Sequence, residues 1–235
     1  MMILLKFMAA TVVLVSTLSM TSVVQAENKP VAITKALSAV TITHKGMAVE
    51  LMREQDNANM ITQDFALTSR PCPPFCIQPM VFAPGVETLG ELEVIDHLVR
   101  MQSDEKILVI DSRTPNWVAK GTIPGAINIS WVSLTPAKGA TTEGIMDIML
   151  NQMDVTLIGD VDEFEVDEAI VNGTVADVFN YAQAKTLVLF CNGMWCGQSP
   201  ASMKTLLSFG YPAEKIKWFR GGMQTWQVLG LTTVK

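Results

Sequence analysis

The chain has 235 residues, a net charge of −6 and four cysteines, and 49% of its residues are hydrophobic. Such an acidic chain without basic clusters argues against binding to nucleic acid or to anionic membrane surfaces, so we expect neither partner. Its length suffices for one ordinary domain plus an extension.

Residues 1–26 have the features of a secretory signal peptide. Lys6 is the only charged residue before Glu27, an apolar stretch spans residues 7–20, and small residues precede the expected cleavage after Ala26. We therefore expect an exported protein, either periplasmic or secreted. An uncleaved signal anchor is the alternative, although the apolar stretch is short for a membrane span. We expect no other contact with a membrane.

Residues 27–85 form an N-terminal extension with little helical patterning. Strand-like runs at 40–43 and 47–51 flank a turn and predict a β-hairpin. Residues 56–69 are polar and predict irregular structure. Four prolines within residues 70–79 exclude helix and central strand, so this segment is expected to be an extended strap.

Short apolar strands alternate with helices from residue 86 to residue 235. The expected helices are at 90–99, 117–120, 167–184, from near Ser199, and up to Trp226, and a division of the third helix at Gly173 is the alternative. The expected strands are at 106–111, 126–129, 187–190 and 216–219. This alternation predicts an α/β domain with a mainly parallel sheet.

The run 187–190 ends directly in Cys191, and a short loop leads from this cysteine to the next helix. A thiol in that position faces backbone N–H groups and the positive end of a helix dipole, and both favour the thiolate. We therefore expect Cys191 to be nucleophilic.

Three segments, in order, resemble the rhodanese (sulfurtransferase) family. Residues 109–113 and 121–128 are similar to its strand-Asp-x-Arg and Gly-His-Ile-Pro-Gly-Ala signature, with Thr122 where histidine is usual. The second segment is the strand ending at Cys191, and the third, 220–226, is similar to the Gly-Gly-x-x-x-Trp that closes the domain. The resemblance covers 86–235, with an insertion at about 140–173, and implies a rhodanese-like three-layer fold.

The resemblance also implies a mechanism without cofactor or metal. Cys191 would carry sulfane sulfur as a persulfide and pass it to a thiol or another nucleophile. The substrate would be a small sulfur anion, such as thiosulfate or a polysulfide, or a persulfide or thiol on a protein. Asp111 and Arg113 would shape the loop ends near the site. The residues expected to bind the substrate are those of the loop: Gly193, Met194, Trp195, Gly197, Gln198 and Ser199.

The loop departs from the family pattern in three ways. It is two residues longer than usual, Gln198 stands where arginine is expected, and Cys196 adds a second thiol. No charged residue lies between Cys191 and Lys204, so the loop lacks the cationic side chain that would bind thiosulfate. Ordinary transfer from thiosulfate to cyanide is therefore not favoured.

The cysteine pairing stays open at the level of sequence. Export places all four cysteines in an oxidising compartment. Cys72 and Cys76 would form a structural disulfide in the strap, act as a second redox pair with the loop, stay free or pair across to it. Cys196 would be a resolving thiol or disulfide partner of Cys191, reduced by a redox partner protein, or have no role. The spacings fit a four-cysteine zinc site poorly.

Two functions of other classes remain beside sulfur transfer. A thiol–disulfide redox protein would use Cys191 and Cys196 as its working pair. A non-catalytic rhodanese-like module would bind a partner through the strap and Trp195.

Overall fold

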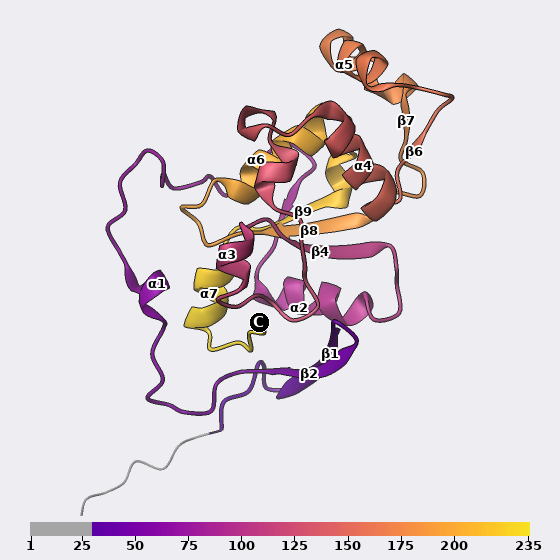
Figure 1. Cartoon of the computed structure of the whole chain (residues 1–235). Helices are drawn as coiled ribbons and strands as arrows, with labels where there is room; N and C mark the ends of the chain where they lie inside the picture. Colours follow the sequence, from indigo (N-terminus) through magenta and orange to yellow (C-terminus); the bar gives the residue numbers. More distant parts are fainter. Residues whose placement is uncertain (1–29) are drawn as a thin grey trace, which may run out of the picture.

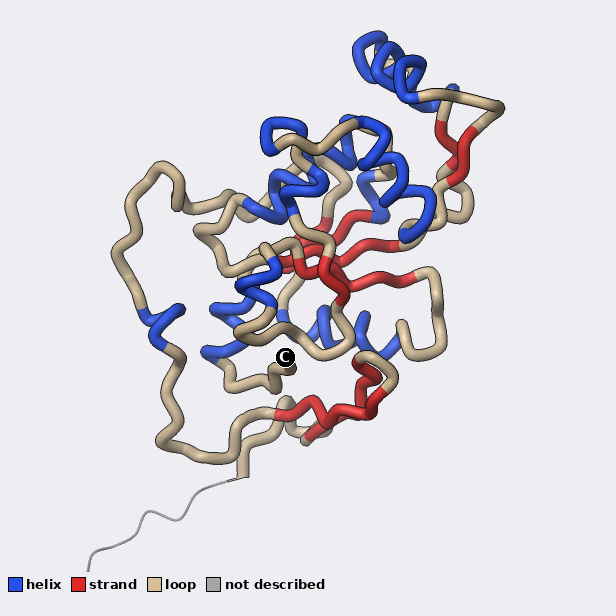
Figure 2. Tube along the Cα trace, in the orientation of Figure 1, coloured by secondary structure: helices blue, strands red, loops and turns tan. Residues whose placement is uncertain are grey.

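A computed structural model describes residues 30–235, and the predicted signal peptide at 1–26 lies outside the described residues. A five-stranded parallel sheet forms the centre of the molecule (Figures 1 and 2). Its strands, in spatial order, are β3 (Glu87–Thr88), β9 (Ile216–Phe219), β8 (Thr186–Phe190), β4 (Ile107–Asp111) and β5 (Ile127–Asn128). The expected α/β class with a parallel sheet is confirmed.

Helices cover both faces of the sheet and make a three-layer domain (Figure 1). One face is covered by α4 (Thr142–Gln152) and α6 (Gln198–Ser208), and the other by α2 (Glu91–Arg100), α3 (Pro115–Val118) and α7 (Gly222–Val228). Side chains of β8 alternate between the two cores: Leu187 and Leu189 pack toward α6, whereas Val188 and Phe190 pack toward α2 and α7. This two-residue period explains why the strand is apolar throughout.

The N-terminal hairpin packs onto the domain. Strands β1 (Ala39–His44) and β2 (Met47–Met52) are antiparallel, and Lys45 and Gly46 make the turn with positive φ of 50° and 77°. Ile42 and Leu51 are fully buried in the same core as α2 and α7. The predicted hairpin is therefore confirmed, and it shares a hydrophobic core with the domain that follows it.

Three predicted segments differ in detail. Residues expected to be irregular contain α1 (Gln63–Ala66), because Phe65 is buried against the domain. The strap is not extended throughout, since a turn with a hydrogen bond from Phe75 N–H to Pro71 O interrupts it. The helix predicted at 167–184 is α5 (Glu163–Asn172), which ends where Gly173 takes a left-handed conformation that terminates helices.

After that glycine the chain forms a small antiparallel ribbon in place of the expected helix. Strand β7 (Phe179–Asn180) pairs with β6 (Thr156–Leu157), and Figure 1 shows α5 and this ribbon projecting from the body of the domain. The region expected to be an insertion, about 140–173, holds α4, β6 and α5. The short 3₁₀ helices are Trp131–Leu134, Pro136–Lys138, Val175–Asp177 and Ala213–Lys215. Among the described residues, no helix is both long and apolar enough to span a membrane.

Candidate active site

The loop between β8 and α6 lies at the carboxyl edge of the parallel sheet, where ligands of such sheets usually bind. Cys191 follows the last residue of β8, and α6 begins at Gln198. The end of β4, with Asp111, pairs with the end of β8 at Phe190. The fold thus brings the predicted cysteine loop and the predicted Asp-x-Arg segment to the same edge of the sheet.

The start of α7 fixes the backbone of this loop. The N–H groups of Met223 and Gln224 donate to the carbonyl oxygens of Cys191 and Asn192, both at 2.9 Å. Gly222 has a positive φ of 54°, and a Cβ at this position would collide with the carbonyl oxygen of Cys191. Glycine is therefore required here, because only a residue without a side chain allows so close an approach.

The sulfur of Cys191 lies among neutral groups, and as a thiol it donates to Cys196 O at 3.5 Å. The hydroxyl of Ser199 donates to Cys191 Sγ at 3.2 Å, and Trp218 Nε1 donates to that hydroxyl oxygen at 3.2 Å. Burial raises the pKa of Cys191, but hydrogen bonds from the Cys196 thiol, the Ser199 hydroxyl and the N–H groups of Ser199 and Gly193 outweigh burial, so the pKa is lowered. The Ser199 N–H belongs to the first turn of α6, where the helix dipole also favours a negative charge.

The second thiol of the loop has the opposite character. Burial raises the pKa of Cys196, and the hydrogen bond and negative charge of Cys191 raise it further. Cys196 therefore keeps its proton when Cys191 is ionised. The two side chains act as one acid–base pair in which the charge resides on Cys191.

Both thiols are closed off from solvent. Cys191 is 2% exposed and Cys196 is 4% exposed. The turn above them is closed by a hydrogen bond from Cys196 N–H to Gly193 O at 2.9 Å. Of the predicted binding residues, Met194 and Gly197 are exposed, Trp195 and Gln198 are half-buried, and Gly193 and Ser199 are buried. A molecule that reaches Cys191 must therefore displace part of the loop.

A buried ion pair supports the start of the loop. Arg113 Nη2 lies 2.6 Å from Asp111 Oδ2, and both side chains are 1% exposed. Thr122, which replaces the usual histidine, donates its hydroxyl to the same carboxylate at 2.7 Å. Arg113 also donates to the Asn192 side chain at 3.5 Å. The pair therefore lies under the residue next to Cys191 without contacting the sulfur.

The strap lies directly against the cysteine loop, which the sequence left undecided. Gln78 N–H donates to Met194 O at 2.8 Å. The Phe75 ring meets the Trp195 ring edge-on at 5.6 Å, and the Arg70 guanidinium lies 3.8 Å from the centre of the Trp195 ring. Trp195, half-buried, is thus the main contact between loop and strap.

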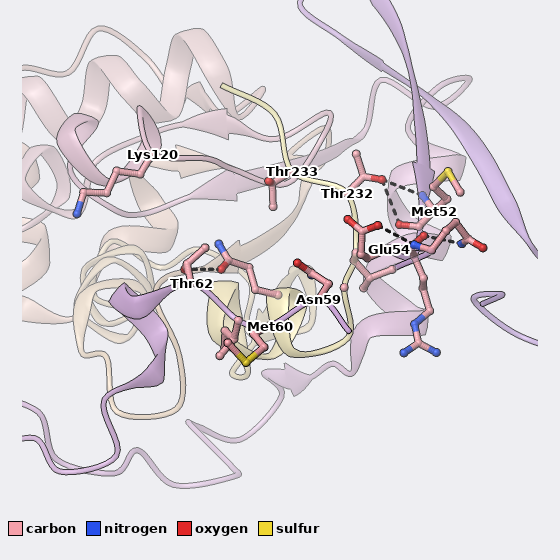
Figure 3. A pocket seen from close by; sticks show the side chains of 14 residues that line it. Met52, Glu54, Asn59, Met60, Thr62, Lys120, Thr232 and Thr233 are labelled. Atoms are coloured by element: carbon pink, nitrogen blue, oxygen red, sulfur yellow. Dashed lines mark hydrogen bonds between the residues drawn. The ribbon is translucent and has the colours of Figure 1, made fainter. Parts of the chain in front are cut away.

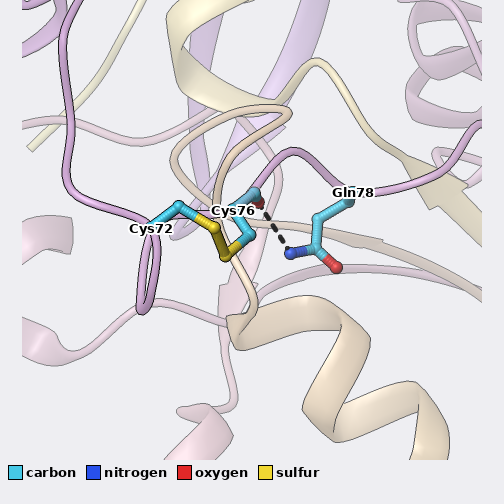
Figure 4. The surroundings of a disulfide bond; sticks show 3 residues. All are labelled: Cys72, Cys76 and Gln78. Carbon is cyan, nitrogen blue, oxygen red and sulfur yellow. Dashed lines mark hydrogen bonds between the residues drawn. A yellow bond between two sulfur atoms is a disulfide. The ribbon is translucent and has the colours of Figure 1, made fainter.

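Cys72 and Cys76 form a disulfide in this strap (Figure 4). The side-chain amide of Gln78 donates to Cys76 O at 3.0 Å, and Arg220 donates from Nε and Nη2 to Gln78 O at 3.0 and 2.8 Å. Arg220 therefore holds the strap and is not a replacement for the missing arginine of the loop. Lys204 is exposed on α6.

One cavity borders this region, and another lies away from it. A groove of about 1010 Å³ runs between strap and loop and is lined by Arg70, Phe75, Ile77, Met194, Trp195 and both strap cysteines, among others. A second cavity of about 550 Å³ lies between residues 52–62 and the C-terminal segment (Figure 3), and its lining contains no cysteine. Across residues 30–235, no group of three or more His, Cys, Asp or Glu side chains is arranged to hold a metal ion.

Comparison with known proteins points to one family. The model of the rhodanese-like domain matches residues 94–229, which is more than half of the chain. Human single-domain sulfurtransferase TSTD1, a solved structure, is 17% identical to this chain, with a TM-score of 0.34, over 62% of this chain and 97% of its own. A likeness of that size carries no argument about activity. No curated protein matches the sequence.

Proposed function

Because this chain belongs to the rhodanese-like domain family, we propose that it is a sulfurtransferase that carries sulfane sulfur on Cys191. The observation that supports this proposal most is the hydrogen bonding of Cys191 Sγ, which combines a lowered pKa with donors suited to a negatively charged persulfide. The thiolate is the nucleophile in sulfur chemistry, so a cysteine that ionises easily is the natural acceptor.

The proposed cycle has two displacements. Cys191 thiolate attacks the outer sulfur of the donor, a Cys191 S–S bond forms, and the S–S bond of the donor breaks, with sulfite leaving from thiosulfate or a thiolate from a persulfide. An acceptor thiolate then attacks the outer sulfur of Cys191, takes it as a persulfide and restores the Cys191 thiolate. The N–H groups of Gly193 and Ser199 and the Ser199 hydroxyl would stabilise the negative persulfide in the same way that they stabilise the thiolate.

The charge of the loop argues for particular donors. No cation contacts either loop sulfur within residues 30–235, since Arg113 is paired with Asp111 and Arg220 binds the strap. A dianion such as thiosulfate loses more hydration on entry than a monoanion, and no charge compensates for it here. We therefore propose a protein-borne persulfide, which carries a single negative charge, as the preferred donor, and a thiol as the acceptor.

The compartment is part of the same proposal. A disulfide in the strap suits an oxidising compartment. We propose that the protein acts after export, in the periplasm or outside the cell.

Intact mass spectrometry tests the sulfur-carrier role. The fully reduced protein is incubated with polysulfide or thiosulfate and weighed, and one added sulfur raises the mass by ~32 Da, as sulfur carriage on one persulfide requires. We expect this gain in the native sequence and in Cys72→Ser/Cys76→Ser, and its loss in Cys191→Ser. The absence of an adduct with every sulfane donor would refute the proposal.

A second candidate function has its own support. Cys191 Sγ lies 3.5 Å from the carbonyl oxygen of Cys196, so the second thiol of the loop is near enough to attack Cys191 Sγ when that atom carries a persulfide sulfur. Such an attack on the persulfide would form a Cys191–Cys196 disulfide and release hydrosulfide, and a redox partner would then have to reduce the loop. A reversible loss of two hydrogens in the loop peptide, without any sulfur adduct, would favour this thiol–disulfide function over sulfur transfer.

A further inference from the structure

The strap that carries the disulfide docks on the loop that carries the two thiols. Phe75, directly before Cys76, packs on Trp195, directly before Cys196. Gln78, two residues after Cys76, donates to the carbonyl of Met194, two residues before Cys196. The contacts on both sides of Cys76 thus fall on the residues that precede Cys196.

The two pairs differ in access. Cys72 is exposed and Cys76 is half-buried, and both line the open groove between strap and loop. The loop sulfur atoms are closed off, with 2% and 4% of each residue exposed. A protein reductant or oxidant can therefore contact the strap pair in the structure as it stands, whereas it cannot contact the loop pair.

We propose that the Cys72–Cys76 disulfide is a redox-active pair that exchanges electrons with Cys191 and Cys196 inside the same molecule. The exposed strap would connect the buried loop to an external dithiol reductant or disulfide oxidant. The proposal rests on the reactive Cys191 thiolate of the proposed function, and it adds a second reactive centre outside the residues matched by the family model.

The exchange balances without any outside reagent. When the loop segment over the thiols moves aside, Cys191 thiolate attacks one strap sulfur. A mixed disulfide between Cys191 and that sulfur forms, the strap S–S bond breaks, and the departing strap thiolate takes up the proton of Cys196. Cys196 thiolate then attacks Cys191 Sγ, and the second strap sulfur leaves as a thiolate. The loop is oxidised to a disulfide and the strap is reduced to a dithiol.

The reverse reaction gives the strap a use in the cycle. A dithiol reductant that opens the exposed strap disulfide supplies two electrons, and the strap dithiol passes them to a loop disulfide by the same steps. A loop that has released its sulfur as hydrosulfide would regain its thiols in this way. The buried pair need not meet the reductant itself.

The docking of the strap does not depend on the disulfide. Hydrogen bonds from Gln78 N–H to Met194 O and from Arg220 to Gln78 O hold it, and the Arg70 side chain packs on Trp195. The disulfide closes a ring with a sequence separation of only 4, and short rings constrain the unfolded chain least. A reduced strap is therefore expected to remain beside the loop, as exchange requires.

Trapping the mixed disulfide tests the relay. Two variants each leave one strap cysteine with Cys191: Cys76→Ser/Cys196→Ser and Cys72→Ser/Cys196→Ser. After mild oxidation at high dilution and checks of folding by circular dichroism, peptide mapping should find a strap peptide linked to the loop peptide in a monomer. Free thiols alone, or links only between molecules, in both folded variants would overturn the relay.

The native sequence provides a second readout. Protein equilibrated over a series of dithiothreitol redox ratios should show the oxidation of both pairs. The loop of Cys72→Ser/Cys76→Ser should approach equilibrium at least tenfold more slowly than the loop of the native protein. An unchanged rate would also contradict the relay. Sulfur uptake by fully reduced protein does not involve the strap disulfide, so uptake without a strap–loop link refutes this inference alone, and a link without uptake refutes sulfur transfer alone.

Discussion

The two cysteine pairs have nearly the same spacing in the sequence and opposite surroundings in the fold. Cys72 and Cys76 lie in a proline-rich strap, exposed or half-buried, and are joined by a disulfide. Cys191 and Cys196 are free thiols enclosed between a core strand, two helix starts and a buried ion pair. The framework around a cysteine, and not its spacing from the next one, therefore determines whether it is a buried nucleophile or part of an exposed disulfide.

The largest expected effect concerns the framework of the loop pair. Arg113→Ala removes the partner of a fully buried carboxylate and leaves Asp111 with an uncompensated charge. We expect a loss of about 3–5 kcal/mol in the free energy of unfolding, measured by urea denaturation, because the carboxylate keeps its desolvation cost without its partner.

An exposed ion pair provides the matched control. Arg100 and Asp96 lie 3.4 Å apart with more than half of each side chain exposed. Arg100→Ala should cost at most about 1 kcal/mol. Equal losses in the two variants would show that the loop does not depend on the buried pair.

A smaller effect is expected at the strap pair. Cys72→Ser/Cys76→Ser removes a disulfide with a sequence separation of 4, which by chain entropy contributes about 2 kcal/mol to the free energy of unfolding. Reduced native protein should show the same loss in urea denaturation. A loss as large as that of Arg113→Ala would mean that the strap holds the fold and not only the surface of the loop.

The smallest expected effect concerns the ionisation of Cys191. Ser199→Ala removes the hydroxyl that donates to Cys191 Sγ, so the lowered pKa of Cys191 should rise by about one unit. The thiolate fraction near pH 7 should then fall, and alkylation of Cys191 by iodoacetamide, followed by mass spectrometry over pH, should slow by up to about tenfold.

Ser202→Ala is the control for this change, because its hydroxyl lies on the same helix and donates to Gln198 O instead of sulfur. The pH midpoint for alkylation of the native protein should lie below about 8.5, the ordinary pKa of a cysteine. A midpoint that Ser199→Ala leaves in place would show that the backbone donors alone set the ionisation of Cys191.

Much of the fold was predictable because its signals are local. The apolar run of β8, the carboxylate at the end of β4 and the two glycines at the start of α7 each indicate an element within a few residues. The helix predicted at 167–184 was wrong beyond Asn172, because the pattern continues past Gly173 while the backbone at this glycine turns left-handed. α1 was missed because only the burial of Phe65 in a distant core makes this segment helical.

The site was predictable in its centre and not at its rim. Cys191 follows a strand and precedes a helix, and this local order is sufficient to identify it. The contacts of Trp195 with Arg70 and Phe75 join residues about 120 apart in the sequence. The proline content predicts a stiff strap, but nothing local indicates which surface such a strap covers.

Site-resolved mapping of the bound sulfur tests the central claim most directly. Reduced protein is treated with polysulfide, persulfides are trapped by alkylation, and peptides are sequenced by tandem mass spectrometry. We predict the added sulfur on Cys191 in the loop peptide, with the strap peptide carrying only alkylated thiols. Sulfur on Cys72 or Cys76 with none on Cys191 would contradict the account, because the exposed pair would then be the sulfur carrier.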